Sequence, residues 1–246
     1  GRYGKNLWSD NDVGEKISIR GFWQTKEESI FVSDVVEKLL LEKKSLKEIA
    51  ILFRVSAHTR SFEERFISLG LPYKIIGGLR FYERKEIKDI IAYLRLVNNP
   101  NDDLAFERII NVPKRGIGKT TIQKIHSIAR LEKLSMLEAS IILIQGSNNK
   151  INNEIRNFIN NIKQWSNLKN KLSHIELVQL ILEDSMYIAF LETEEKKSKN
   201  PENLNRLDNI KEFVESLKDF ENLEGFLEHV SLVMENNTNT SDSTIS

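Results

Sequence analysis

A proline followed by two closely spaced glycines, near the middle of the chain, is the feature that most limits what this sequence can fold into. Pro113 stops a helical pattern that runs through residues 106–110, because its ring blocks the helical path and it has no amide proton. After Gly116 and Gly118, isoleucines recur at helical spacing. Glycine tolerates backbone angles that a side chain forbids. The stretch therefore predicts a helix, a tight hairpin and a second helix.

The chain around this hairpin is basic. Residues 108–130 contain six Lys or Arg and no Asp or Glu, the six being Arg108, Lys114, Arg115, Lys119, Lys124 and Arg130. Amides at the start of a helix point outward and carry the positive end of the helix dipole, so they attract anions. We expect these amides, mobile Lys and Arg charges and two threonine hydroxyls to surround a phosphate without reading any base. The predicted site comprises Lys114, Arg115, Gly116, Ile117, Gly118, Lys119, Thr120 and Thr121.

Two other interpretations of the hairpin exist. Gly118-Lys119-Thr120 matches the end of an ATP-binding phosphate loop, but that motif requires a glycine where this chain has Pro113, and a strand in place of the helical pattern before it. The spacing therefore argues against a nucleotide site. A helix end and a turn without any ligand remains an alternative on the motif alone.

The composition excludes several classes of protein. The 246 residues, 40% of them hydrophobic, suffice for one large or two small domains, and with no cysteine there is neither a disulfide nor a thiolate metal site. No apolar run approaches the roughly 20 residues of a membrane span, so we expect no membrane association and a cytoplasmic location. We expect no catalytic residue and no metal site, because no nucleophile and base pair is visible and the histidines lack ligand spacing: His58, His126, His174 and His229.

The formal net charge of zero hides a division along the chain. Residues 1–182 contain 30 Lys or Arg against 21 Asp or Glu, whereas residues 183–246 contain six against 15. This division indicates a basic working surface and an acidic end. The acidic end is either a set of solvated helix faces or a surface that docks a partner.

Hydrophobic periodicity divides the chain into two parts. Before residue 98, patterns typical of strands alternate with patterns typical of helices, which predicts an α/β fold with a partial parallel sheet. The predicted strands are residues 16–22, 48–53 and 72–76, and the predicted helices are residues 27–43, 57–69 and 77–96. After the polar, proline-broken residues 98–103 the pattern becomes all-α. Helical stripes are predicted at residues 104–110, 122–129, 136–142, 151–165, 175–182, 204–217 and 226–233, with a loop at 192–200.

A glycine pair, Gly77 and Gly78, follows the third predicted strand. Open α/β sheets bind ligands beyond the carboxyl ends of their strands, which places Arg80 and Phe81 in such a crevice. Phe81 could stack on a nucleic-acid base. A core position is the alternative for this aromatic side chain.

Three blocks of sequence, residues 50–64, 71–89 and 106–120, resemble the UvrD/Rep/PcrA family of superfamily 1 DNA helicases in order, spacing and side chains, and residues 223–232 resemble it weakly. The resemblance implies an incomplete RecA-like motor domain 2A at residues 1–97. It implies the inserted helical domain 2B, with its helix-hairpin-helix-like Gly-Ile-Gly turn, at residues 98–236. We expect residues 237–246 to form a flexible tail.

The resemblance also implies a function, that of a fragment of an ATP-dependent 3′ to 5′ DNA helicase acting in repair or replication. In such enzymes the Gly116-Ile117-Gly118 turn would hold the duplex backbone ahead of the fork, and Arg54 would contact an ATP phosphate in the parent protein. The single-stranded DNA path or domain interface would include Arg60, Gly77, Gly78, Arg80 and Phe81.

The family's phosphate loop and Mg²⁺-binding carboxylates are missing from this chain. We therefore expect the fragment to have no cofactor and no catalysis of its own, ATP and Mg²⁺ belonging to the parent. Its expected partners are DNA at a single-strand/duplex junction and the remaining helicase domains. The alternatives are a non-catalytic protein-interaction or autoregulatory helical module, and an autonomous ATPase.

Overall fold

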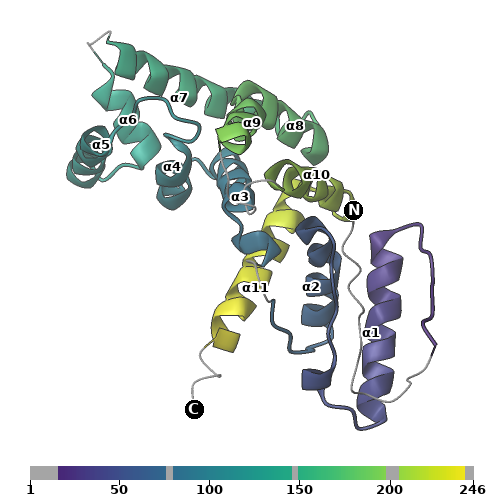
Figure 1. Ribbon diagram of the computed structural model, residues 1–246. Coiled ribbons are helices and arrows are strands. Elements are labelled where there is room, and N and C mark those ends of the chain that lie inside the picture. The colour runs from purple at the N-terminus through teal and green to yellow at the C-terminus, as the bar shows by residue number, and fades with distance from the viewer. Residues whose placement is uncertain (1–15, 76–79, 146–148, 198–204, 242–246) are drawn as a thin grey trace.

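The computed structural model describes residues 16–75, 80–145, 149–197 and 205–241, and its regular structure in these ranges is helical. Figure 1 shows α4 to α9 at one end of the molecule, α1 and α2 at the other, and α3, α10 and α11 between them. The α-helices are α1 (Thr25–Leu41), α2 (Thr59–Ser68), α3 (Lys85–Asn98), α4 (Asp103–Ile109), α5 (Lys119–Glu132), α6 (Met136–Leu143), α7 (Lys150–Leu168), α8 (His174–Asp184), α9 (Tyr187–Lys197), α10 (Arg206–Ser216) and α11 (Leu223–Ser241). Short 3₁₀ turns are η1 (Leu46–Glu48), η2 (Ser56–His58), η3 (Phe81–Glu83) and η5 (Leu217–Asp219).

The predicted parallel sheet is wrong, since no strand occurs in the described ranges. Residues 16–22, 49–53 and 71–75 have no regular structure, and within the described part of the chain no backbone hydrogen bond joins them to one another. A strand persists only where a neighbouring strand takes up its amides and carbonyls. Without that pairing the apolar side chains stay in solvent, as at Ile17 (92% exposed) and Leu52 (95% exposed).

Local sequence signals predict the helices better than they predict the strands. Asp102 caps α4, its carboxylate accepting a hydrogen bond from the Ala105 amide at 3.0 Å. Reciprocal serine and glutamate capping boxes begin α6 and α8. The loop predicted at residues 192–200 is wrong as far as Lys197, because α9 continues to that residue. Likewise α11 extends to Ser241, into the segment predicted as a tail.

One continuous apolar core extends along the chain from Phe81 to Val233. Its central element is α3, which packs against α4, α7, α8, α10 and α11. Ile87, Ile90 and Leu94 of this helix are fully buried. The domain boundary predicted after residue 97 therefore falls at the end of α3. The buried face of this helix packs against helices that come from the predicted second domain. No helix in the described ranges is long and apolar enough to cross a membrane.

Candidate nucleic-acid interface

The hairpin between α4 and α5 exposes its two glycines and buries the residue between them. Gly116 has φ +76°, a conformation that strains any residue with a side chain. Gly118 is the N-cap of α5. Both glycines are exposed, whereas Ile117 is 1% exposed and belongs to the core. Ile117 thus helps to anchor the hairpin, which presents glycine backbone to solvent between the two predicted helices.

The amides of the hairpin fall into two groups. Those of Arg115 and Ile117 point inward and donate to Asn111 Oδ1, at 2.8 and 3.2 Å. The Thr121 amide donates to the Gly118 carbonyl at 3.1 Å and so starts the helix. Within residues 116–120, the remaining amides have no acceptor in the described part of the chain, and they are those of Gly116, Gly118, Lys119 and Thr120. These four are available to an anion.

Arg115 is expected to supply mobile charge to the predicted site, but in this structure its charge is directed inward and is held by several hydrogen bonds. Its guanidinium donates to the carbonyls of Ile109 and Ile110 at 2.9 and 3.0 Å and to the Tyr93 hydroxyl at 2.7 Å. The same group lies over the Phe158 ring, 5.1 Å from the centroid. Arg115 therefore braces the hairpin from behind.

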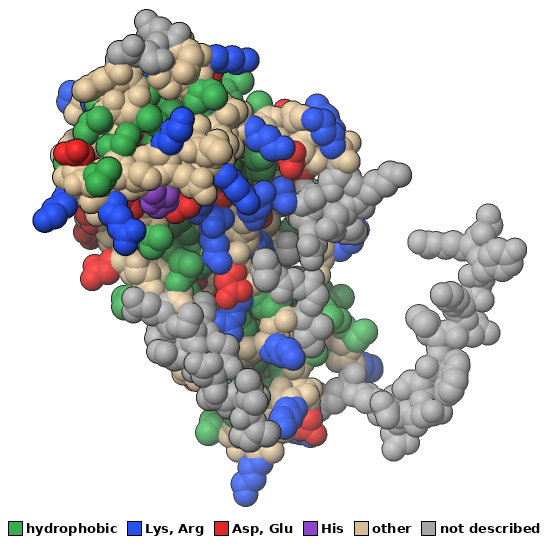
Figure 2. All heavy atoms as spheres, turned by 90° about the vertical axis from the view of Figure 1, so that its left-hand side faces the viewer, with side chains coloured by type: hydrophobic (Ala, Val, Ile, Leu, Met, Phe, Trp, Pro, Cys, Tyr) green, Lys and Arg blue, Asp and Glu red, His purple; other side chains and the backbone are tan. Residues whose placement is uncertain are grey.

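The other cations of this segment differ in their partners. Arg108 is paired with Asp89 at 2.7 Å. Four exposed cations have no ion-pair partner within the described residues, namely Lys114, Lys119, Lys124 and Arg130. Figure 2 faces the end of the molecule that carries α5 and shows Lys and Arg side chains around its edge. Positive potential at this end thus comes from lysines beside the hairpin and along α5, together with the α5 dipole.

Phe81 is a core residue in this structure, where its ring is not accessible for stacking on a base. It is 0% exposed, its ring lies 5.3 Å from that of Tyr82, and the Arg84 guanidinium lies over it at 5.1 Å. Arg80 is half-buried, with its guanidinium 5.3 Å from the centre of the Tyr73 ring. The apolar alternative for Phe81 is the one observed.

The residues predicted to meet nucleotide or single-stranded DNA elsewhere give a mixed result. Arg54 is exposed and has no ion-pair partner in the described ranges. Gly77 and Gly78 lie outside the described residues. The segment before the hairpin is helix α4, which agrees with the rejection of a phosphate loop at Gly118.

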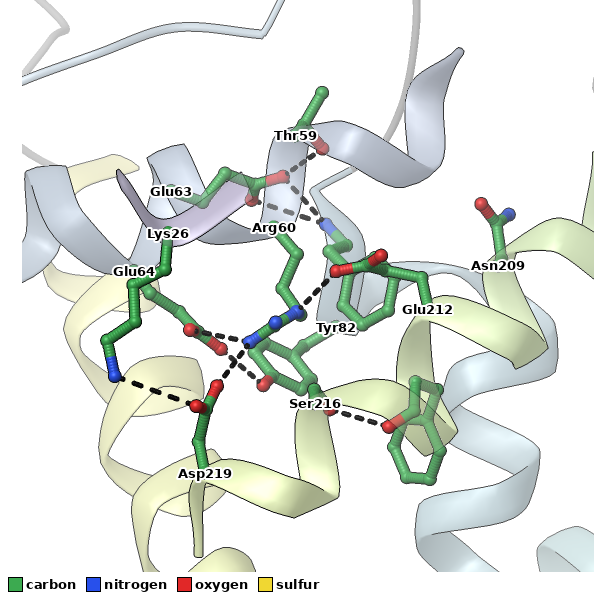
Figure 3. Close-up of polar contacts among 12 residues, drawn as sticks. Lys26, Thr59, Arg60, Glu63, Glu64, Tyr82, Asn209, Glu212, Ser216 and Asp219 are labelled. Carbon is green, nitrogen blue, oxygen red and sulfur yellow. Dashed lines mark hydrogen bonds and ion pairs between the residues drawn. The ribbon is translucent and has the colours of Figure 1, made fainter. Parts of the chain in front are cut away.

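Arg60 is expected on the single-stranded DNA path or at a domain interface, and in this structure its side chain is only 6% exposed. Figure 3 shows it inside a cluster of acids from three elements. Its Nε donates to Glu212 and its Nη1 to Glu64, both at 2.8 Å, and Asp219 lies 3.8 Å away. Burial lowers the pKa of Arg60, but the charges of Glu64 and Glu212 outweigh it and raise the pKa above its ordinary value.

Glu64 is the second centre of this cluster. It accepts a hydrogen bond from the Tyr82 hydroxyl at 2.7 Å, and His229 Nε2 lies 3.8 Å away. Burial raises the pKa of Glu64, but the nearby His229 and Arg60 outweigh burial and hold the pKa below its usual value. The acidic C-terminal helices thus neutralise a buried arginine of α2, and this internal pairing accounts for part of the charge division seen in the sequence.

A second buried set of contacts joins the start of α3 to α10. Arg84 donates to Asn209 Oδ1 at 2.8 Å, and the Asn209 amide donates to Glu86 at 2.6 Å. Glu63 of α2 accepts from the amide of Phe81 at 3.2 Å. Together, the Arg60 cluster and these contacts of Asn209 hold α10 and the turn after it against α2 and α3.

Comparison with known proteins identifies the family. The chain belongs to the family described as the UvrD-like helicase C-terminal domain, whose model matches residues 1–245. The resemblance predicted from the three sequence blocks is confirmed.

Among its relatives are proteins named as DNA helicases. The chain is 42% identical over 238 residues to a probable DNA helicase II homolog of Rickettsia conorii, covering 96% of this chain and 36% of that protein. It is 43% identical over 219 residues to the ATP-dependent DNA helicase PcrA of Bacillus subtilis, covering 88% and 29%. For the PcrA protein of Staphylococcus aureus the identity is 37% over 241 residues, covering 93% and 32%. The chain spans about a third of the length of these relatives.

Proposed function

We propose that this chain is part of an ATP-dependent 3′ to 5′ DNA helicase that acts in repair or replication, and that its hairpin holds the duplex backbone. The names of its relatives support the first statement. The observation that carries the second is the group of four amides without acceptors in the described part of the chain, beside Lys114 and Lys119. Phosphate oxygens are the natural acceptors for such a group.

The shape of the hairpin supports close approach by a phosphodiester. A Cβ added at Gly116 or Gly118 would meet no protein atom within 4 Å. The space in front of the turn is therefore open, and the missing side chains let a phosphate reach the amides. Because amides and lysines contact phosphates and not base edges, binding is expected to be independent of sequence and strongly dependent on salt.

ATP chemistry belongs to the parent protein in this proposal. Arg54, exposed on the α2 side, would reach an ATP phosphate across the cleft between motor domains. The described residues contain no group of three or more His, Asp or Glu side chains that could hold a metal ion, and the hairpin lacks the features of a phosphate loop. These residues do not fit an ATP and Mg²⁺ centre, so we derive no step of hydrolysis from this chain.

The remaining helicase domains are the proposed protein partner. Several large apolar side chains at the α1 end of the molecule are exposed, including Ile17, Ile19, Trp23 and Leu52. Exposed apolar side chains in such a group are typical of a surface that another part of a protein covers. The rest of the motor domain in the parent would supply that cover.

The test measures binding of a fluorescent forked DNA by anisotropy between 50 and 200 mM salt, concentrations over which phosphate contacts weaken by roughly several orders of magnitude for large sites. Lys119→Glu should weaken binding equally for two unrelated DNA sequences. Lys44→Glu is the matched control, because Lys44 is exposed and follows α1 at the far end of the molecule from α5 (Figure 1). This control should bind like the unaltered chain.

Three outcomes would contradict parts of the proposal. Salt-insensitive binding, or binding unchanged by Lys119→Glu, would remove the hairpin as the phosphate contact. Absence of any DNA binding at low salt would favour the protein-interaction or autoregulatory module. Release of phosphate by the isolated chain on addition of ATP and DNA would favour an autonomous ATPase.

A further inference from the structure

Asn111 organises the inner side of the hairpin. Its single carboxamide oxygen accepts from two alternate amides, those of Arg115 and Ile117. In a tight turn, fixing alternate amides on one side directs the amide between them to the other side, and here that amide belongs to Gly116. Asn111 therefore uses up the inward amides and leaves the outward ones without a partner in the described part of the chain.

Arg115 ties the same hairpin to three helices. Ile109 and Ile110, whose carbonyls accept from it, stand at the C-terminus of α4, where carbonyls lack helical partners and a cation is favourable. A third acceptor is the Pro113 carbonyl within the hairpin, at 3.3 Å. All three carbonyls accept from Nη1, whose two hydrogens they share, and Nη2 is left to donate to the Tyr93 hydroxyl.

Tyr93 of α3 also holds the hairpin in place. It receives a hydrogen bond from Arg115 at 2.7 Å and donates its own proton to the Val112 carbonyl at 2.5 Å. Burial raises the pKa of Tyr93, which keeps the hydroxyl protonated and able to donate. Val112 and Arg115 are thus both attached to α3 through one hydroxyl group.

We propose that Asn111 and Arg115 are positioning residues, which hold the hairpin so that its free amides face a phosphate, and that neither residue contacts DNA. This inference rests on the proposed function of the hairpin. In this inference Arg115 supports the hairpin from inside the protein, and Lys114 and Lys119 make the charged contacts with phosphate.

The experiment separates position from contact by the salt dependence of DNA binding. A cation that contacts phosphate contributes about one unit to the slope of log affinity against log salt, whereas a lost neutral amide contact lowers affinity at every salt concentration without changing the slope. Lys119→Met, a contact residue, should lower the slope by about one. Arg115→Lys, Arg115→Met and Asn111→Leu should each lower affinity roughly tenfold or more and leave the slope unchanged.

Each other outcome has a defined meaning. If Arg115→Lys binds like the unaltered chain while Arg115→Met lowers the slope by about one, Arg115 is a phosphate ligand and the inference is overturned. Unchanged affinity in Asn111→Leu, with the fold verified by circular dichroism at the assay temperature, overturns it as well. Should the Arg115 variants fail to fold, Asn111→Leu decides alone. Failure of the unaltered chain to bind, or of Lys119→Met to weaken binding, overturns the proposed function itself.

Discussion

Replacing Arg60 with methionine removes the charge from the buried acid cluster while keeping an unbranched side chain. Arg60 is 6% exposed and has two carboxylates at 2.8 Å. The side chains of Glu64 and Glu212 are 21% and 15% exposed, so water reaches them only partly. Removing one partner of a buried ion pair costs about 3–5 kcal/mol, because the other charge is left without compensation. Because both acids are partly exposed, we expect Arg60→Met to lower the free energy of unfolding by about 3 kcal/mol, the lower end of this range.

The assay is urea denaturation followed by circular dichroism, together with thermal melting. For a chain of this size about 1 kcal/mol corresponds to a shift of about 2–4 °C, so Arg60→Met should lower Tm by roughly 6–12 °C. Lys26→Met is the matched control, since Lys26 pairs with Asp219 of the same cluster at 3.6 Å but is 68% exposed. An exposed pair of this kind contributes less than about 1 kcal/mol.

The pH dependence provides a second check on the same variant. In the folded chain the pKa of Glu64 is lowered, so its stabilising contribution is present above the unfolded pKa of about 4.3 and is lost as pH falls through the folded value. Without Arg60, part of the interaction that lowers this pKa is lost and the pKa rises, so the ionised form of Glu64 becomes less favourable at neutral pH. The destabilisation should therefore be larger at pH 7.5 than at pH 4. A loss below about 1 kcal/mol, or one equal at both pH values, would refute this reasoning.

Two further predictions concern the hairpin and the core. Gly116→Ser should cost about 1–2 kcal/mol in urea denaturation because of its φ of +76°, whereas Gly118→Ser, at an extended N-cap with φ −87°, should keep the stability and still weaken DNA binding in the anisotropy assay. Equal stability losses for both, or full DNA affinity in Gly118→Ser, would contradict the geometry of the turn. Phe81→Ala should cost about 3–5 kcal/mol by the same denaturation, since the ring is 0% exposed; a loss near zero would argue for a surface role.

The sequence was sufficient for the hairpin because its signals are local. Pro113 ends one helix, and glycine permits the angle found at Gly116, so neither depends on distant parts of the chain. The strands were predicted from equally local alternation, as in residues 16–22, but a strand also needs a neighbour, and periodicity contains no information about pairing. The sheet prediction failed at that step.

The contact partners of Arg60 and Arg115 could not be predicted from the sequence. Arg60 meets Glu212 across 152 positions, and no spacing rule connects residues so far apart. Arg115 looked like its neighbour Lys114, yet it turns inward because the carbonyls at the end of α4 require donors. Asn111 was overlooked, although an asparagine before a turn is a residue type that often accepts from turn amides.

Helix α3 gives the molecule a mechanical connection between α10, in its middle, and the hairpin (Figure 1). Glu86, in the first turn, is bonded to Asn209 of α10, and Tyr93, about two turns later, is bonded to Arg115 behind the hairpin. Seven residues of α-helix span only about 10 Å and behave as a stiff rod. A tilt of α3 imposed by α10 would therefore be transmitted to the glycine turn, so that a change in the middle of the molecule would move the hairpin.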